Sequence, residues 1–280
     1  MKKLVFVGLI GSVALLGLSS ARNAMVEHAL KVNLMIGKMP LELGKTYKTP
    51  GGADYQVDLL KFYTSNVQLV KADGSSQMVP GLSLVSFMPE MNAAGAQSGH
   101  NHGGGMAMQG MLEGGQMQKA KSTQNETFFS IKAPAGDYKG VRFEVGVPKE
   151  FNHRDASTLP LPLGLESGMF WSWNPGYIFF RLEGKVMVDG KAQPWLLHMG
   201  TDNWRMNVNK FDLATNKIKL TVDGKSSTVF NLDIEKLFSK GPNGAATWDL
   251  TNEKQRVMHG GPNVGQAYLN LIGAWDLQMQ

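Results

Sequence analysis

The sequence predicts a mainly β protein, built as an antiparallel β-sandwich with Greek-key-like connections. Many short segments alternate apolar and polar residues or are rich in β-branched and aromatic side chains. Glycine, proline, asparagine and aspartate separate these segments at regular intervals, as in sandwiches and barrels. Strands do not alternate with long helical patterns, which argues against a βαβ fold. With 280 residues, the chain can bury one sizeable core.

Residues 1–21 are predicted to be an export signal peptide. Lys2 and Lys3 precede a mostly apolar stretch from Leu4 to Leu18, and Ser19-Ser20-Ala21 offers a small-residue cleavage site. The apolar stretch is too short for a confident membrane anchor, and no other long apolar run follows. We therefore expect residues 22–280 to form a single domain without an integral membrane segment. Its location would be the periplasm, the cell surface or the medium.

The predicted strands follow one another along most of the chain. Val26 to Ile36 alternates strictly, so His28 shares one face with the apolar residues at every second position. Later strands are separated by turn signals such as Ala72-Asp73-Gly74 and Asp189-Gly190, and both of these predict hairpin turns. They are expected over residues 55–70, 127–131, 141–147, 177–188, 195–199, 218–222 and 229–232.

Two segments depart from this strand pattern. Residues 88 to about 121 are rich in glycine and methionine and show no periodicity, which predicts a mobile insertion. The segment from about 233 to 280 is expected to be irregular, with short helices over Asp233 to Phe238 and Gln266 to Ile272.

Composition limits the chemistry that the chain can perform. It has no cysteine but 17 methionines, so it lacks thiolate ligands and is rich in thioethers, which suit cuprous copper. The formal net charge is +5, and no basic cluster is interleaved with aromatic residues, so we expect no nucleic-acid partner. Motifs of serine hydrolases, P-loop enzymes and zinc proteases are absent, which predicts a protein without catalytic activity.

Trp171 and Trp173 lie two residues apart, just before Pro175-Gly176 and a dense aromatic segment. In an extended strand their indoles would point to the same face. An intact indole donates a hydrogen bond but offers no lone pair to a metal. The two rings therefore either pack in the core or line a site.

Five motifs occur in the order that is typical of one known family. The chain resembles the MbnP-like family of exported copper-binding proteins, and its lack of cysteine matches the cysteine-free branch. The segments that carry the resemblance are Pro40 to Tyr47, Leu60 to Val67, Tyr138 to Val147, the W-x-W segment around Trp171 and Trp173, and Trp195 to Gly200.

The resemblance implies a β-rich periplasmic or surface protein that handles copper. It also implies a partner, a dihaem cytochrome c peroxidase-like enzyme of the MauG type, which oxidises a tryptophan to kynurenine. Ring opening would give Trp171 or Trp173 an aromatic amine and a ketone that can bind a metal.

His153 and His198 are the predicted copper ligands, together with Trp171 or Trp173 as kynurenine. Two neutral imidazoles from separate segments make a reasonable copper site, and Asp155 could fix a tautomer. The alternative is that His153 is a solvated loop residue and His198 a hydrogen-bonded strand residue. His259 has no partner in the sequence and is expected in a loop. A weaker auxiliary site in the insertion would use His100, His102, Met106, Met108 and Met111.

The leading hypothesis is an exported, non-catalytic copper-binding protein for copper acquisition or homeostasis, whose cargo is Cu⁺ or Cu²⁺. A metal-free sandwich that binds a protein or glycan through its aromatic strand competes with it. A small-molecule carrier that uses the aromatic pocket is a third option.

Overall fold

The computed structural model describes residues 24–88, 125–171, 176–208, 220–238, 248–259 and 262–277. The predicted signal peptide, Trp173 and nearly all of the predicted insertion, with its candidate ligands His100, His102, Met106, Met108 and Met111, lie outside the described residues. Within the described part of the chain, no helix is both long and apolar enough to cross a membrane.

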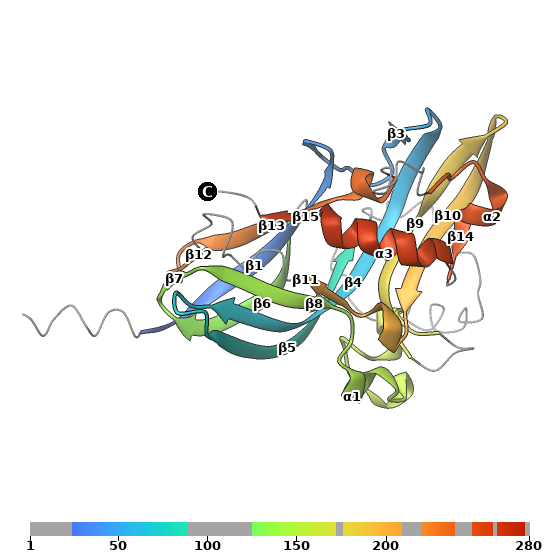
Figure 1. Ribbon diagram of the computed structural model, residues 1–280. Helices are drawn as coiled ribbons and strands as arrows, with labels where there is room; N and C mark the ends of the chain where they lie inside the picture. Colours follow the sequence, from blue (N-terminus) through green and yellow to red (C-terminus); the bar gives the residue numbers. More distant parts are fainter. Residues whose placement is uncertain are drawn as a thin grey trace, which may run out of the picture.

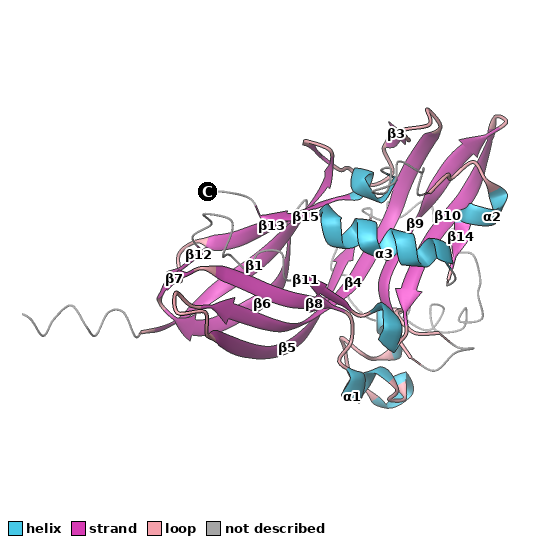
Figure 2. Cartoon of the chain, in the orientation of Figure 1, coloured by secondary structure: helices cyan, strands magenta, loops and turns pink. Residues whose placement is uncertain are grey.

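The predicted fold class is confirmed: strands dominate and form a curled sandwich with a few short helices (Figures 1 and 2). The smaller main sheet has the order β15-β13-β1-β2, with β6 also beside β1. Its strands are β1 (Met25–Ile36), β2 (Met39–Pro40), β6 (Asn125–Pro134), β13 (Ser227–Asp233) and β15 (Trp275–Leu277).

The larger sheet has the order β11-β8-β4-β9-β10-β14, with β3 and β5 also paired to β4. Its strands are β3 (Thr46–Lys48), β4 (Asp54–Val70), β5 (Ser76–Phe87), β8 (Gly140–Val145), β9 (Ile178–Val188), β10 (Lys191–Gly200), β11 (Met206–Val208) and β14 (Val257–Met258). A separate ribbon pairs β7 (Gly136–Tyr138) with β12 (Leu220–Val222).

The alternation predicted for the first strand is confirmed in β1. Every second residue from His28 to Ile36 is buried, and the residues between them are partly exposed. Among the strands of the described segments, two pairs are parallel, β1 with β13 and β10 with β14, and the other pairs are antiparallel. Both parallel partners come from far along the chain, so no local turn signal could indicate their direction.

The predicted hairpin around Asp189-Gly190 is confirmed and joins β9 to β10. Asp189 and Gly190 have φ angles of 50° and 73°, the positive values that a two-residue hairpin turn needs at both central positions. This tight turn fixes the register of the pair. It sets Arg181 opposite His198 and Glu183 opposite Leu196.

Aromatic side chains fill the core between the two main sheets. Phe143 lies at the centre, in edge or tilted contact with Phe128, Phe230 and Trp275. A second apolar cluster covers the opposite face of the larger sheet and was not predicted. It contains Tyr63, Val147, Ala156, Leu163, Met169, Trp171, Tyr177, Ile178 and Phe179.

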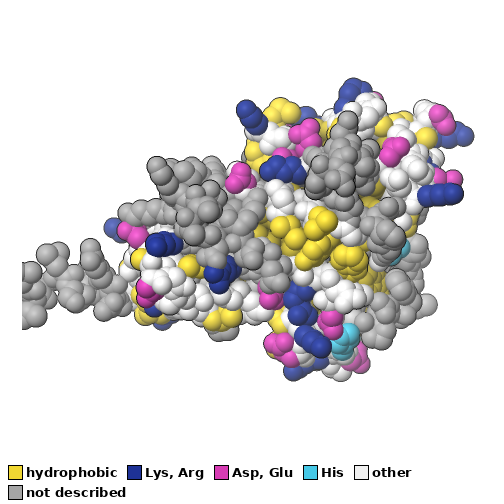
Figure 3. All heavy atoms as spheres, viewed as in Figure 1, with side chains coloured by type: hydrophobic (Ala, Val, Ile, Leu, Met, Phe, Trp, Pro, Cys, Tyr) yellow, Lys and Arg dark blue, Asp and Glu magenta, His cyan; other side chains and the backbone are white. Residues whose placement is uncertain are grey.

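The C-terminal segment is more regular than the sequence indicated. The predicted short helices are present as the 3₁₀ helix η5 (Ile234–Phe238) and the longer α3 (Pro262–Ala274). Helix α3 packs against η5, β10 and β11 and buries Leu271 in the main core. Figure 3 shows apolar side chains gathered over α3, where Leu269 is exposed. Strands β14 and β15, which extend the two sheets, were not predicted.

The remaining helices are short. They are α1 (Lys149–Asn152), η2 (Ala156–Thr158), η3 (Leu165–Ser167), η4 (Asp202–Trp204) and α2 (Glu253–Arg256). The first three lie between β8 and β9, in the segment that leads to Trp171.

Burial of His28 should make the fold sensitive to acid. Burial lowers the pKa of His28 below 6.5, although Asp223 partly opposes this, and the ring nitrogen Nε2 lies 2.9 Å from Thr228 Oγ1. As pH falls below 6.5, the unfolded chain gains a proton at His28 that the folded chain resists, so the free energy of unfolding should fall. Urea unfolding of native protein and His28→Gln between pH 7 and 5 measures this. Equal pH slopes for the two proteins would contradict the assignment.

Candidate functional site

The candidate site lies on the outer face of the larger sheet, away from the main core. On β10, Trp195, Leu197 and Met199 point into the main core, so Leu196 and His198 project from the other face. The register brings side chains of β9 and β4 to the same face, because His198 pairs with Arg181 and Arg181 pairs with Lys61. Three nitrogen-bearing side chains therefore form one row across three strands.

His198 is fixed by a carboxylate on the neighbouring strand. Its side chain is buried, and Nε2 lies 2.7 Å from Glu183 Oε1. The Nε of Arg181 donates to the same carboxylate oxygen, also at 2.7 Å. Burial alone would raise the pKa of Glu183, but hydrogen bonds from His198 and Arg181 outweigh it and lower that pKa to about 2. The carboxylate therefore stays ionised near neutral pH.

His259 is the residue that sequence reasoning missed. Its ring and that of His198 have centroids 4.9 Å apart and planes inclined at 68°. The cause is the parallel pairing of β10 with β14, which sets Leu196 beside Val257 and Leu197 beside Met258. Continued by one residue, this register aligns His259 with His198. Two apolar residues before a His-Gly-Gly sequence give too weak a signal to predict a paired edge strand.

Trp171 lies on the same face of the sheet and packs against the end of β10. Its side chain is 8% exposed, and a Cβ at Gly200 would overlap Trp171 Cη2 and the carbonyl oxygen of Tyr177. Trp171 follows a single bridge between Phe170 and Tyr177, and its backbone nitrogen donates to Gly176 at 3.3 Å. Trp171 itself is not part of a strand and directly follows this isolated bridge.

Two cations hold the turn that precedes Trp171. Arg181 Nη1 donates to the carbonyl oxygen of Gly168 at 2.8 Å, and Lys61 Nζ donates to that of Ser167 at 3.1 Å. Gly168 ends η3 with a φ of 62°, a left-handed conformation that glycine adopts without a steric penalty. Burial and the charge of Arg181 lower the pKa of Lys61.

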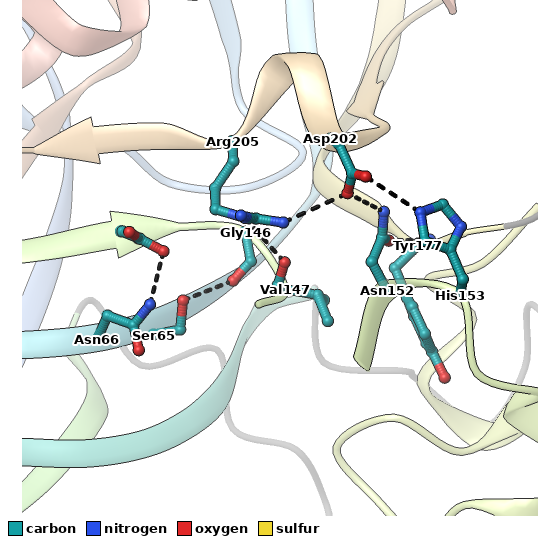
Figure 4. Close-up of polar contacts among 10 residues, drawn as sticks. Ser65, Asn66, Gly146, Val147, Asn152, His153, Tyr177, Asp202 and Arg205 are labelled. Carbon is teal, nitrogen blue, oxygen red and sulfur yellow. Dashed lines mark hydrogen bonds and ion pairs between the residues drawn. The ribbon is translucent and has the colours of Figure 1, made fainter. Parts of the chain in front are cut away.

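His153 belongs to a different set of contacts (Figure 4). Its side chain is 54% exposed, and Nε2 lies 3.1 Å from Asp202 Oδ2, just after β10. Asn152 Nδ2 donates to the other oxygen of Asp202 at 2.9 Å, and Asn152 Oδ1 accepts from the backbone nitrogen of Tyr177. The hydrogen bond from His153 contributes most to the lowered pKa of Asp202.

This network joins α1 to η4 and to Tyr177, the residue before β9. Arg205 joins it through Nη2, 3.4 Å from Asp202 Oδ1. Asp155, the predicted tautomer-fixing group, instead caps η2 by accepting from Ser157. The two predicted imidazoles, His153 and His198, thus interact with different carboxylates, and His198 has His259 as its neighbouring ring.

The two imidazoles, with ring centroids 4.9 Å apart, would together offer nitrogen ligands to one metal ion. No group of three or more His, Cys, Asp or Glu side chains in the described ranges is arranged to hold a metal ion. A third ligand in this part of the chain would have to come from another kind of group.

The comparisons with known proteins agree with the sequence motifs. The family model for MbnP matches residues 26–259, a region that starts in β1 and ends at His259. Among solved structures, MbnP from Methylosinus trichosporium is similar, with 18% identity and a TM-score of 0.49. The match covers 80% of this chain and 84% of that chain. No curated protein matches the chain.

Substitution of Gly200 tests how Trp171 is seated. Gly200→Ala should lower the free energy of unfolding by about 1–3 kcal/mol, because the new methyl group overlaps the indole and a backbone carbonyl. Gly136→Ala is the matched control, since a Cβ there meets nothing within 4 Å. Urea unfolding, followed by circular dichroism, measures both variants. Equal stability of the two would show that Trp171 does not occupy the space beside Gly200.

Proposed function

The chain belongs to the MbnP family, and we propose that it is an exported, non-catalytic protein that binds copper for acquisition or homeostasis. The observation that carries this proposal is the pairing of His198 with His259, 4.9 Å apart between ring centroids. Neutral imidazole is a good ligand for copper, and the chain has no cysteine thiolate that could compete. The site would sit in the periplasm or at the cell surface.

His198 and His259 supply the two nitrogen ligands in this proposal. The ring of His198 is held by Glu183, as expected for a metal-binding histidine whose other nitrogen donates to a carboxylate. The parallel register of β10 and β14, continued by one residue, aligns the two rings. His153 is not assigned to the site, because its hydrogen bond to Asp202 ties it to η4.

Trp171 would supply the third ligand after oxidation to kynurenine. It packs against Gly200, two residues beyond His198 on β10, on the face from which His198 projects. A dihaem cytochrome c peroxidase-like partner of the MauG type would use two equivalents of hydrogen peroxide. The C2–C3 bond of the indole breaks, each of these two carbon atoms gains one oxygen atom, and two water molecules are released. Hydrolysis of the product then releases formate and leaves kynurenine. The aromatic amine and ketone that remain can bind a metal.

The burial of Trp171 also favours the copper proposal over the alternative, in which a metal-free sandwich binds a protein or glycan through its aromatic strand. A glycan or protein site built on stacked aromatic rings needs ring faces that are open to the partner. Trp171 is 8% exposed and packed in the cluster that contains Tyr177 and Phe179. A buried Trp171 is better suited to line a binding site than to stack its ring face against a glycan or protein at the surface.

Copper stoichiometry distinguishes the ligand pairs. Native protein should hold about one tightly bound copper ion per chain, and His198→Ala and His259→Ala should each lose it because one imidazole is a weak site. His153→Ala is the matched control and should keep it. Metal analysis after dialysis against a weak chelator measures the copper content, with circular dichroism as a check of folding. Retention in His259→Ala with loss in His153→Ala would instead identify His153 and His198 as the ligands.

Mass spectrometry tests the proposed modification. Protein made together with the dihaem enzyme of its native host should gain about 4 Da, since kynurenine has one carbon less and one oxygen more than tryptophan. Peptide mapping should place the gain at Trp171. Trp171→Phe should show no gain and should bind copper more weakly. A gain that persists in Trp171→Phe would assign the modification to another tryptophan.

A further inference from the structure

We infer that Tyr63 and Tyr177 are positioning residues for Trp171, because their hydroxyl groups hold the segment from Pro162 to Gly168 that leads to the indole. The inference rests on the proposed function, in which Trp171 supplies the third copper ligand. It concerns how that ligand is held, and it involves neither of the two histidines.

Side chains from β4, from β9 and from the residue before β9 bind the backbone of this segment at both of its ends. At the first end, Tyr63 Oη donates to the carbonyl oxygen of Pro162 at 2.7 Å, and Tyr177 Oη donates to that of Leu163 at 2.8 Å. At the second end, the two cations described above donate to two further carbonyls. Four side chains thus hold four carbonyl groups of one short segment.

Both tyrosine hydroxyls are buried and are neutral donors. The side chains of Tyr63 and Tyr177 are almost completely buried, and their rings meet edge to face with centroids 5.9 Å apart. Burial raises the pKa of each phenol, so each hydroxyl keeps its hydrogen near neutral pH. Loss of a partner by a buried hydroxyl or carbonyl is unfavourable, so these contacts hold the segment against the sheet.

Further backbone contacts connect this segment to Trp171. The hydroxyl oxygen of Ser167 accepts from the backbone nitrogen of Met169 at 3.2 Å, and the carbonyl of Met169 accepts from the backbone nitrogen of Ile178 at 2.8 Å. Met169 is fully buried, and Trp171 lies two residues further along the chain, with its indole against Gly200. Little freedom therefore remains in the backbone that directs the indole.

Tyr177 acts on Trp171 from two directions. Its hydroxyl binds the segment before Trp171, while its backbone pairs with Phe170 in the isolated bridge. Its backbone nitrogen also donates to Asn152 Oδ1 at 2.9 Å, and Figure 4 shows the phenol extending away from that contact. One residue therefore connects the segment before Trp171 to the start of β9.

A fixed backbone matters for the ligand in the proposed function. Ring opening to kynurenine turns the rigid indole into a side chain with an additional rotatable bond, between its ketone and its aromatic ring. Freezing this bond on metal binding lowers affinity, and a backbone that is already fixed adds no further ordering cost. Tyr63 and Tyr177 would therefore raise copper affinity without touching the ion.

Removal of single hydroxyls tests the inference in metal-free, unmodified protein. Tyr63→Phe and Tyr177→Phe each lose one hydrogen bond to the segment. Tyr138→Phe is the matched control, because Tyr138 Oη donates to the carbonyl oxygen of Pro134 at 2.8 Å and belongs to the main core rather than to the second apolar cluster.

Fluorine NMR of protein labelled with 5-fluorotryptophan reports the surroundings of Trp171, whose signal is assigned by its loss in Trp171→Phe. This signal should shift or broaden in Tyr63→Phe and in Tyr177→Phe, because both tyrosines hold the backbone that directs the indole. It should keep its native position in Tyr138→Phe.

Copper affinity measures the functional consequence. Each variant is made together with the dihaem enzyme, and the forms that carry the gain of about 4 Da are compared. Tyr63→Phe and Tyr177→Phe should bind copper about 2- to 10-fold more weakly than native protein, which corresponds to the net free energy of one hydrogen bond. Tyr138→Phe should bind as native protein does, although urea unfolding should show a similar loss of stability in all three variants. Chelator competition measures affinity.

Two results would overturn the inference. A Trp171 signal at its native position in both Tyr63→Phe and Tyr177→Phe would show that the hydroxyls do not place the indole. Equal weakening of copper binding in all three variants would reduce the effect to a general loss of stability. A shifted signal in these two variants, combined with native protein that binds no copper, would instead support the positioning contacts and refute the proposed function.

Discussion

The register of the β9–β10 hairpin is the constraint on which the rest of the site depends. Side chains alternate between faces along a strand, so a slip of one residue would exchange the two faces of β10. Trp195, Leu197 and Met199 would then leave the core, and His198 would enter it beside the apolar layer. The positive φ angles of Asp189 and Gly190 prevent this slip by fixing a two-residue turn. A feature of the turn thus decides which residues can act as ligands on the outer face.

The charged and polar side chains on the outer face of β9 and β10 lower the stability of the fold. Arg181, Glu183 and His198 are all largely removed from water, and desolvation of such groups is only partly offset by their mutual hydrogen bonds. Apolar residues of similar volume would pack there with less desolvation. A polar cluster in a setting otherwise lined by Tyr63, Tyr177 and Phe179 is therefore better explained by a binding role than by a contribution to folding.

Periodicity and turn chemistry made much of the fold predictable. The alternation in β1, the hairpin at Asp189-Gly190 and the short helices near Ile234 and within α3 were all expected from local sequence. The parallel pairings were not predictable from local sequence, because β13 and β14 are separated from their partner strands by many residues. The same limit explains His259, whose role depends on an edge strand of two residues.

His153 shows what sequence proximity can and cannot place. Its position ahead of the tryptophan segment suggested a ligand, yet its nearest carboxylate, Asp155, caps a helix, and its ring contacts Asp202 instead. Sequence proximity indicated the right region but not the direction in which the side chain points. Only tertiary contacts from η4 decide that.

In the proposed function, the position of the paired imidazoles would also link metal binding to the stability of the C-terminal segment. Strand β14 forms only two residue pairs with β10, so its backbone pairing alone contributes little. A ligand that binds the folded state and joins His198 to His259 stabilises that pairing by mass action, because the two rings are brought together only after β14 has docked. It would thereby tie the edge of the sheet to the hairpin that carries Glu183 and His198. The proposed site therefore joins the β9–β10 hairpin to β14, a strand that comes later in the sequence. Metal binding at this site and the docking of β14 would stabilise each other.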